Sequence, residues 1–225
     1  MNRLTYIVFA LLILVIGGGA AWYLVDSRND VLGIPQPTAT STPEIHEGLA
    51  IYTNGSYGFS VFYPDSSDVA YEFDPSYHLG SAWRANALPE ASGVPIVSIV
   101  PYHTESESSY PRYFNAMVRI GASVDPAELA RCEKPSLDQG ETELADVTIG
   151  GRTWKAFSFQ DAGMMQYASG ISYRTVFEDK CIALEKVRTG SSYREEPSAN
   201  DIPEETLDRE YDALTAIVES FTFAR

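Results

Sequence analysis

The stretch YGFSVFYP, residues 57–64, contains four aromatic residues in eight and ends on a proline. Successive side chains of a strand point to opposite faces, so Phe59, Val61 and Tyr63 share one face. That face is wholly apolar or aromatic, which suits a buried core. Proline has no N–H group to donate, so Pro64 ends the pairing at a strand edge. The stretch therefore predicts a core strand that identifies a fold, and not an exposed binding platform.

Composition and charge limit the classes of function. The chain has 225 residues, of which 44% are hydrophobic and 21% charged, as in a globular domain with appendages. Its 31 acidic and 16 basic residues give a net charge of −15. A negative field of this size repels phosphate backbones, and we find no basic cluster to overcome it. We therefore expect no nucleic-acid partner and interpret most carboxylates as solvated surface.

The N-terminus carries a strong membrane signal. Residues 4–25, LTYIVFALLILVIGGGAAWYLV, contain no charge and are long enough to cross a bilayer as a helix. Aromatic residues lie near both ends, where interfacial aromatics belong, and Arg3 favours a cytoplasmic N-terminus. We predict a short cytoplasmic end (1–3), a single transmembrane helix or signal-anchor (4–25), and an extracytoplasmic remainder. The lipid bilayer is then a partner of residues 4–25.

The alternative is a cleaved signal peptide. Gly19, Ala20 and Ala21 are small residues of the kind found at cleavage sites, and a cut near Ala21 would release a secreted protein. Apolar residues continue through Val25, past that site, which favours a retained anchor. Both alternatives place the remaining chain outside the cytoplasm.

A linker separates the apolar segment from the domain. Residues 26–49 are rich in proline, threonine and serine, a composition typical of a disordered, extended stalk. The folded domain is predicted over residues 50–225. Alternation and turn residues predict strands at about 50–53, 58–63, 68–74, 94–101, 144–149, 152–160, 168–178 and 180–188.

Three helical segments are expected. Residues 109–120 place Phe114, Met117 and Val118 on one helical face. Residues 125–132 predict a short helix with Asp125 as N-cap and a proline at its first position.

The last helix has the clearest pattern. Asp201 and Glu204 resemble a capping box. An apolar stripe at helical spacing follows, and SFTFAR (220–225) predicts a short closing strand. The stripe consists of Leu207, Tyr211, Leu214, Val218 and Phe221.

Cys132 and Cys181 are the only two cysteines. An exported domain lies in a compartment that permits disulfides, and two cysteines without a neighbouring histidine are too few for structural zinc. We predict a disulfide between them; the alternative is two free, buried thiols.

Motifs of catalysis and cofactor binding are not found. The sequence has no GxSxG, GxxxxGK[ST], GxGxxG or HExxH pattern, and its histidines (His46, His78 and His103) lack ligand spacing. We therefore predict no catalytic residue, no metal site and no cofactor.

A binding surface, where the domain has one, is expected at two loops, residues 75–92 and 161–168. The first is long and partly aromatic, and the second has adjacent methionines, which make adaptable contacts. The alternative is that these side chains pack beneath their own loops. The candidate residues are Tyr77, His78, Trp83, Met164 and Met165.

Both ends of the domain resemble a known family. YTNGSYGFSVFYP (52–64) resembles the start of PsbP-like domains, the family of the extrinsic P subunit of photosystem II, and ALTAIVESFTF (213–223) resembles their end. Residues from about 75 to 200 show no such likeness. The resemblance implies an α+β fold, an antiparallel β-sheet packed by a few helices in a sandwich. It transfers no metal site and no photosystem docking.

These observations favour a non-catalytic, single-pass, membrane-anchored module that binds or assembles with a cell-envelope protein. One alternative is an exported sensor or inhibitor-like domain that binds a soluble ligand. A second is a cell-envelope hydrolase that uses acidic residues, whose mark would be a deep cleft lined by convergent carboxylates.

Overall fold

The computed structural model describes residues 48–76, 78–88, 91–104, 114–191 and 202–224. The predicted membrane segment at 4–25, the linker up to residue 47 and Tyr77 lie outside these ranges. Neither of the two α-helices within the described residues combines the length and apolar composition needed to cross a bilayer.

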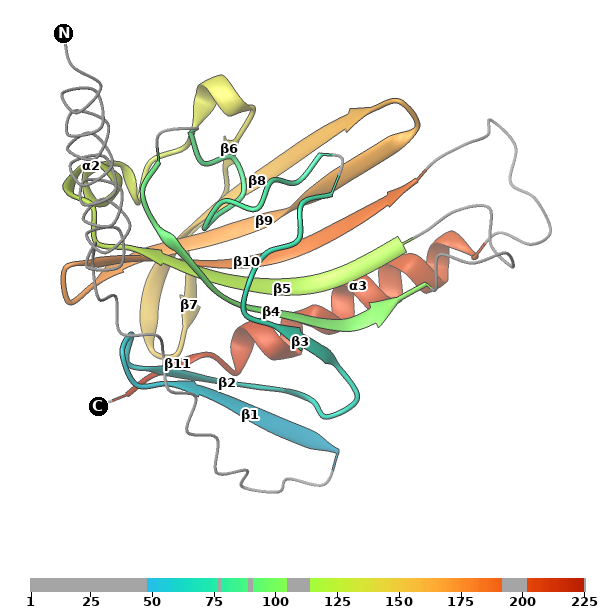
Figure 1. Cartoon of the computed structure of the whole chain (residues 1–225), viewed down its shortest axis with the longest axis horizontal. Coiled ribbons are helices and arrows are strands. Elements are labelled where there is room, and N and C mark those ends of the chain that lie inside the picture. Colours follow the sequence, from blue (N-terminus) through green and yellow to red (C-terminus); the bar gives the residue numbers. More distant parts are fainter. Residues whose placement is uncertain (1–47, 77, 89–90, 105–113, 192–201, 225) are drawn as a thin grey trace, which may run out of the picture. The chain divides into compact units, whose positions relative to one another are not determined.

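The described chain is mostly antiparallel strand (Figure 1). Its strands are β1 (Leu49–Asn54), β2 (Phe59–Pro64), β3 (Asp68–Ala70), β4 (Val94–His103), β5 (Phe114–Ser123), β6 (Thr142–Glu143), β7 (Val147–Ile149), β8 (Arg152–Gly163), β9 (Gln166–Phe177), β10 (Lys180–Ser191) and β11 (Thr222–Phe223). Its helices are α2 (Pro126–Arg131), the single 3-10 turn η1 (Leu137–Gln139) and α3 (Glu204–Glu219).

Two sheets enclose the core. The small sheet has the order β1-β2-β11, and the large one runs β3-β4-β5-β10-β9-β8-β6, with β7 paired to β8. Helix α3 packs on β5 and β10 and also reaches β2, so it contacts both sheets. The prediction of an α+β fold with an antiparallel sheet and few helices is confirmed.

The opening stretch behaves as a core strand. Phe59 and Val61 are buried, and the Phe59 ring stacks on Phe221 with centroids 5.0 Å apart. The chain enters β2 through Gly58, whose φ of 66° is in the left-handed region that glycine adopts without strain. β11 pairs only with the first two residues of β2. On that side, β2 is therefore an open sheet edge from Val61 to its end at Pro64.

Helix α3 presents the predicted stripe to the core. Leu214 and Val218 are fully or almost fully buried, and Leu207 and Tyr211 pack at the margin of the same cluster. The predicted capping box is wrong, because α3 begins at Glu204 with Pro203 as N-cap and no side-chain cap. The short helix α2 is as predicted, with the Asp125 carboxylate accepting hydrogen bonds from two N–H groups of its first turn.

The helix predicted at 109–120 is wrong where the structure describes it, since residues 114–123 form strand β5. Phe114, Ala116, Val118 and Ile120 alternate into the main core. Met117, between them, packs on the opposite face of the sheet. Both faces of this strand are covered, so apolar residues occur on both. The alternation of polar and apolar residues expected of a strand is therefore lost, and some of the apolar residues fall at helical spacing.

The face of the large sheet opposite α3 is covered by residues 71–93, as far as they are described, which we call the strap. Trp83 of the strap packs against the disulfide cysteines. Its carbonyl lies where a Cβ on Gly121 would stand, so β5 needs a glycine at that point. The strap thus contacts the sheet backbone directly.

Candidate functional site

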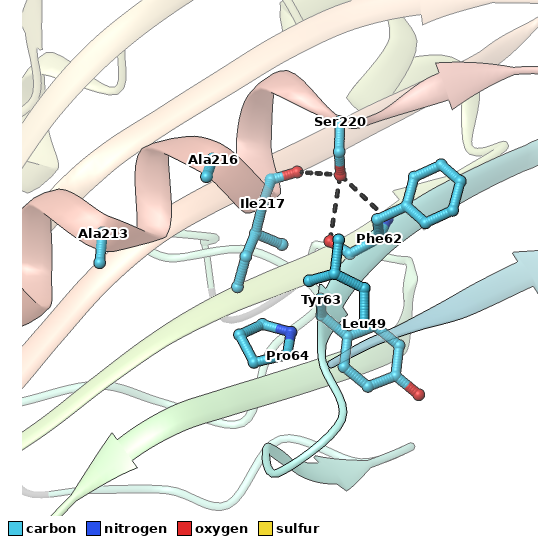
Figure 2. Close-up of a pocket in the computed structure, with 8 residues that line it drawn as sticks. All are labelled: Leu49, Phe62, Tyr63, Pro64, Ala213, Ala216, Ile217 and Ser220. Carbon is cyan, nitrogen blue, oxygen red and sulfur yellow. Dashed lines mark hydrogen bonds between the residues drawn. The ribbon is translucent and has the colours of Figure 1, made fainter. Parts of the chain in front are cut away.

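An apolar groove lies between the C-terminal half of α3 and the end of β2 (Figure 2). Its volume is about 360 Å³, within the range of small-ligand or side-chain pockets. The groove exists because Ala213 and Ala216 are small and leave a hollow beside the helix. It is lined by Leu49, Phe62, Tyr63, Pro64, Ala213, Ala216, Ile217 and Ser220.

Ser220 fixes the two walls of this groove to each other. Its hydroxyl oxygen accepts a hydrogen bond from the Phe62 N–H at 2.9 Å and lies 3.1 Å from the Phe62 carbonyl oxygen. The same hydroxyl lies 2.7 Å from the Ile217 carbonyl oxygen. The end of the helix is therefore tied to the strand edge left open by the short β11, so the groove is preformed.

The structure brings together the two loops predicted as a binding surface. His78 Nδ1 lies 3.0 Å from Asp161 Oδ2, and Nε2 lies 2.9 Å from the Gly163 carbonyl oxygen. Both partners only accept hydrogen bonds, so both ring nitrogens donate when the imidazole is protonated. The bond to Gly163 and then the bond to Asp161 raise the pKa of His78 above its ordinary value of 6.5.

Not all of the predicted surface residues lie at the surface. Met164 and Met165 form the two-residue turn between β8 and β9, with positive φ and exposures of 78% and 55%. Trp83 is only 2% exposed, so its inclusion in a surface was wrong. It fills the space over Gly93 and Gly121 beneath the strap. The binding role of the exposed residues stays a prediction.

The contact of His78 predicts a pH dependence of stability. Its pKa in the folded state is raised, so the contact stabilises the fold fully below pH 6.5 and is lost as the pH rises through the folded-state pKa. We expect the melting-temperature difference between the wild type and His78→Gln to shrink from about pH 5.5 to about pH 8.5. Asp161→Asn removes the carboxylate that contacts His78 and serves as the matched variant for the same contact. A difference that stays constant over this range contradicts the assignment.

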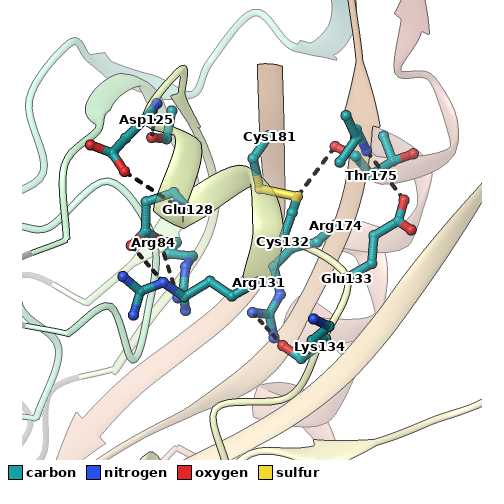
Figure 3. Close-up of a disulfide and its surroundings, with 12 residues drawn as sticks. Arg84, Asp125, Glu128, Arg131, Cys132, Glu133, Lys134, Arg174, Thr175 and Cys181 are labelled. Carbon is teal, nitrogen blue, oxygen red and sulfur yellow. Dashed lines mark hydrogen bonds and ion pairs between the residues drawn. A yellow bond between two sulfur atoms is a disulfide. The ribbon is translucent and has the colours of Figure 1, made fainter. Parts of the chain in front are cut away.

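The disulfide joins α2 to β10 (Figure 3). Cys132 and Cys181 are bonded, with their Cα atoms 5.7 Å apart, which confirms the predicted pair. Both residues are buried beside Trp83 and Ala183. The bond closes a sequence separation of 49 residues beneath the strap.

Next to the disulfide lies a buried cluster of six charges, which we call the charge cluster. Each member is at most 3% exposed, and the three arginines balance the three glutamates. Burial of the guanidinium groups lowers the pKa of Arg119 and Arg174. Its members are Arg84 of the strap, Arg119 of β5, Glu128 of α2, Glu141 directly before β6, Arg174 of β9 and Glu185 of β10.

The charge cluster attaches the strap to the sheet. Arg119 donates to the carbonyls of Gly80 and Ala82 at 3.1 and 3.0 Å. The Glu185 carboxylate accepts from the Ala85 N–H at 2.8 Å. Figure 3 shows Arg84 directed at Glu128 of α2, and that pair is 3.5 Å apart. These side chains satisfy strap backbone groups that have no strand partner, so the cluster is structural.

The described part of the chain contains no preformed set of metal ligands. No group of three His, Cys, Asp or Glu side chains there is placed to hold a metal ion.

Comparison with known proteins returns structures only. No family model and no curated protein matches the chain. The matching solved structures include cyanobacterial PsbP (CyanoP) from Synechocystis, with 13% identity and a TM-score of 0.40 over 80% of this chain and 95% of that chain. A PsbP domain is thus among the structures to which this chain is similar.

Two further structures are similar. LpqN of Mycobacterium tuberculosis, which is involved in cell envelope biogenesis, shares 15% identity with a TM-score of 0.32 over 84% of this chain and 92% of its own. A protein from Bacteroides thetaiotaomicron shares 14% identity with a TM-score of 0.32 over 75% of this chain and 46% of its own.

Proposed function

We propose that the protein is a single-pass, membrane-anchored, extracytoplasmic module that binds a cell-envelope protein without catalysing a reaction. The observation that carries this proposal is the preformed apolar groove between α3 and β2. It is concave, apolar and held by Ser220, which are the properties of a site that receives a partner's side chain.

Two features support the extracytoplasmic location. A disulfide between buried cysteines is typical of a compartment outside the reducing cytoplasm. The uncharged segment 4–25 provides a membrane anchor of sufficient length, and the Pro/Thr/Ser-rich residues 26–49 provide a spacer.

The chemistry of the groove selects its occupant. Six of its eight lining residues are Leu, Phe, Pro, Ala or Ile, and the Ser220 hydroxyl is already engaged with Phe62 and Ile217. A polar ligand would lose its hydration there without gaining partners. The occupant is therefore an aliphatic or aromatic side chain of a partner protein, and the acidic surface of this domain favours a partner with a basic rim.

Photocrosslinking in intact cells tests this proposal. A photoreactive residue in place of Ala216, inside the groove, is expected to give one discrete adduct with an envelope protein. The matched control is Glu205, which is exposed at the start of the same helix. The proposal is wrong if the Ala216 position gives no adduct, or the same adducts as Glu205.

A further inference from the structure

A second cavity lies on the other face of the large sheet, away from α3 and the groove. It has a volume of about 380 Å³, the lower part of the range for small-molecule sites. One wall is formed by β3, by residues 72–76 and by Leu79, and the other by residues of β4, β5 and β10. Met117 and Arg119 of β5 line it, and both lie on the face opposite the α3 side of that strand.

Hydroxyl groups without protein partners lie in this cavity's lining. Thr189 is fully buried, and its Oγ1 has no hydrogen-bond partner among the described residues. Ser76, on the opposite wall, is half-buried, but its Oγ is enclosed and likewise has no hydrogen-bond partner among the described residues. A buried hydroxyl that makes no hydrogen bond is destabilising, and such groups in a cavity wall are explained by a ligand that supplies the partner.

The charged residues at the mouth of the cavity determine whether it attracts a positively or a negatively charged ligand. Asp68, Glu72 and Asp74 line it and are all exposed. Among the described lining residues the basic groups are His103, whose Nδ1 lies 3.5 Å from Asp68 Oδ2, and Arg119. The field at the mouth is therefore negative, which attracts cations and repels anions.

Arg119, at the floor, does not reverse this sign. Its charge is balanced by Glu185 at 3.5 Å, and its terminal nitrogens donate to two strap carbonyls. Its guanidinium also lies over the Phe73 ring, 4.0 Å from the centroid. The floor thus holds no cation that is free to take an anionic ligand.

We propose that this cavity binds a small organic cation that also carries hydroxyl groups. Its ammonium group lies at the mouth beside Asp68, Glu72 and Asp74, and its hydroxyls pair with Thr189 and Ser76. A metal ion fits less well, because no three ligating side chains of the described residues converge on one point. The site is independent of the groove, so either proposal stands if the other fails.

Calorimetric titration of the detergent-purified full chain tests the proposal with two sugars. Glucosamine, which has an ammonium group and several hydroxyls, is expected to bind saturably. N-acetylglucosamine has the same ring and hydroxyls without the charge, and is expected to bind about fivefold more weakly. Added salt is expected to reduce this difference, because exposed carboxylates are screened.

Variants locate the binding site. Thr189→Val keeps the side-chain shape without the hydroxyl and is expected to weaken glucosamine binding about fivefold. Asp74→Asn is expected to weaken it about threefold, and because Asp74 is exposed this variant does not endanger folding. Asp65→Asn, an exposed change outside the cavity, is the control and leaves binding unchanged.

Three results overturn the proposal: no saturable binding of glucosamine, equal affinity for the two sugars, or wild-type affinity in both Thr189→Val and Asp74→Asn.

Discussion

Replacing Glu141 with glutamine is expected to lower the free energy of unfolding by about 3–5 kcal/mol. Glu141 pairs with Arg174 at 2.5 Å and lies 3.8 Å from Arg84, and all three side chains are almost completely buried. The neutral amide leaves three buried arginines facing two glutamates. An uncompensated charge in the interior is destabilising because its desolvation is no longer offset by attraction. Urea unfolding followed by far-UV circular dichroism measures the effect.

A matched control lies two residues away. Glu143 pairs with Lys155 at 3.7 Å, but both side chains are substantially exposed, so Glu143→Gln is expected to change stability by at most about 1 kcal/mol. The double variant Glu141→Leu with Arg174→Met removes both charges of the tightest pair and is expected to be less destabilised than Glu141→Gln. Equal effects of Glu141→Gln and Glu143→Gln would show that the interior pair has no special role.

Removing the disulfide is expected to have a similarly large effect. Cys132→Ala with Cys181→Ala opens a loop of 49 residues, and the chain-entropy model gives a loss of about 4 kcal/mol. Since one kcal/mol corresponds to about 2–4 °C for a domain of this size, the melting temperature is expected to fall by about 8–16 °C. Differential scanning calorimetry of the wild type and the double variant measures this shift.

Reductant provides the control for this experiment. It is expected to lower the melting temperature of the wild type toward that of the double variant and to leave the variant unchanged. If reductant and substitution both leave the transition where it is, the two cysteines do not stabilise the fold.

The two ends of the domain could be predicted from sequence because their signals are local. In β2 the face of Phe59, Val61 and Tyr63 is wholly apolar or aromatic, and in α3 the stripe covers one side of the helix, so both elements could be predicted. In β5 both faces are covered, by α3 on one side and the strap on the other, and the resulting pattern was misread as a helix. The turn at Gly150 could be recognised because glycine adopts a positive φ without strain, and the turn at Glu178 because charged residues there separate two β-rich runs.

The groove could not be predicted, because it is made by residues far apart in the chain. Phe62 and Ser220 are separated by 158 positions, and no local sequence pattern indicates that they are in contact. The charge cluster left a weak signal. Arg119, Arg174 and Glu185 each lie inside a strand, on the face that alternation directs toward the strap. Their pairing depends on the register of β5, β10 and β9, which a pattern of residues does not supply.

The position of β11 sets when this domain finishes folding. Ser60 of β2 meets Thr222 of β11 across 162 positions, and Phe221 packs its ring against both Phe59 and Trp154. A ribosome delivers the first strands of the small sheet early and the strand that completes it last. Until residues 221–223 emerge, β2 has only β1 as a partner and the aromatic centre of the core lacks the Phe221 ring. The small sheet and the aromatic centre of the core are therefore complete only once residues 221–223 have been synthesised.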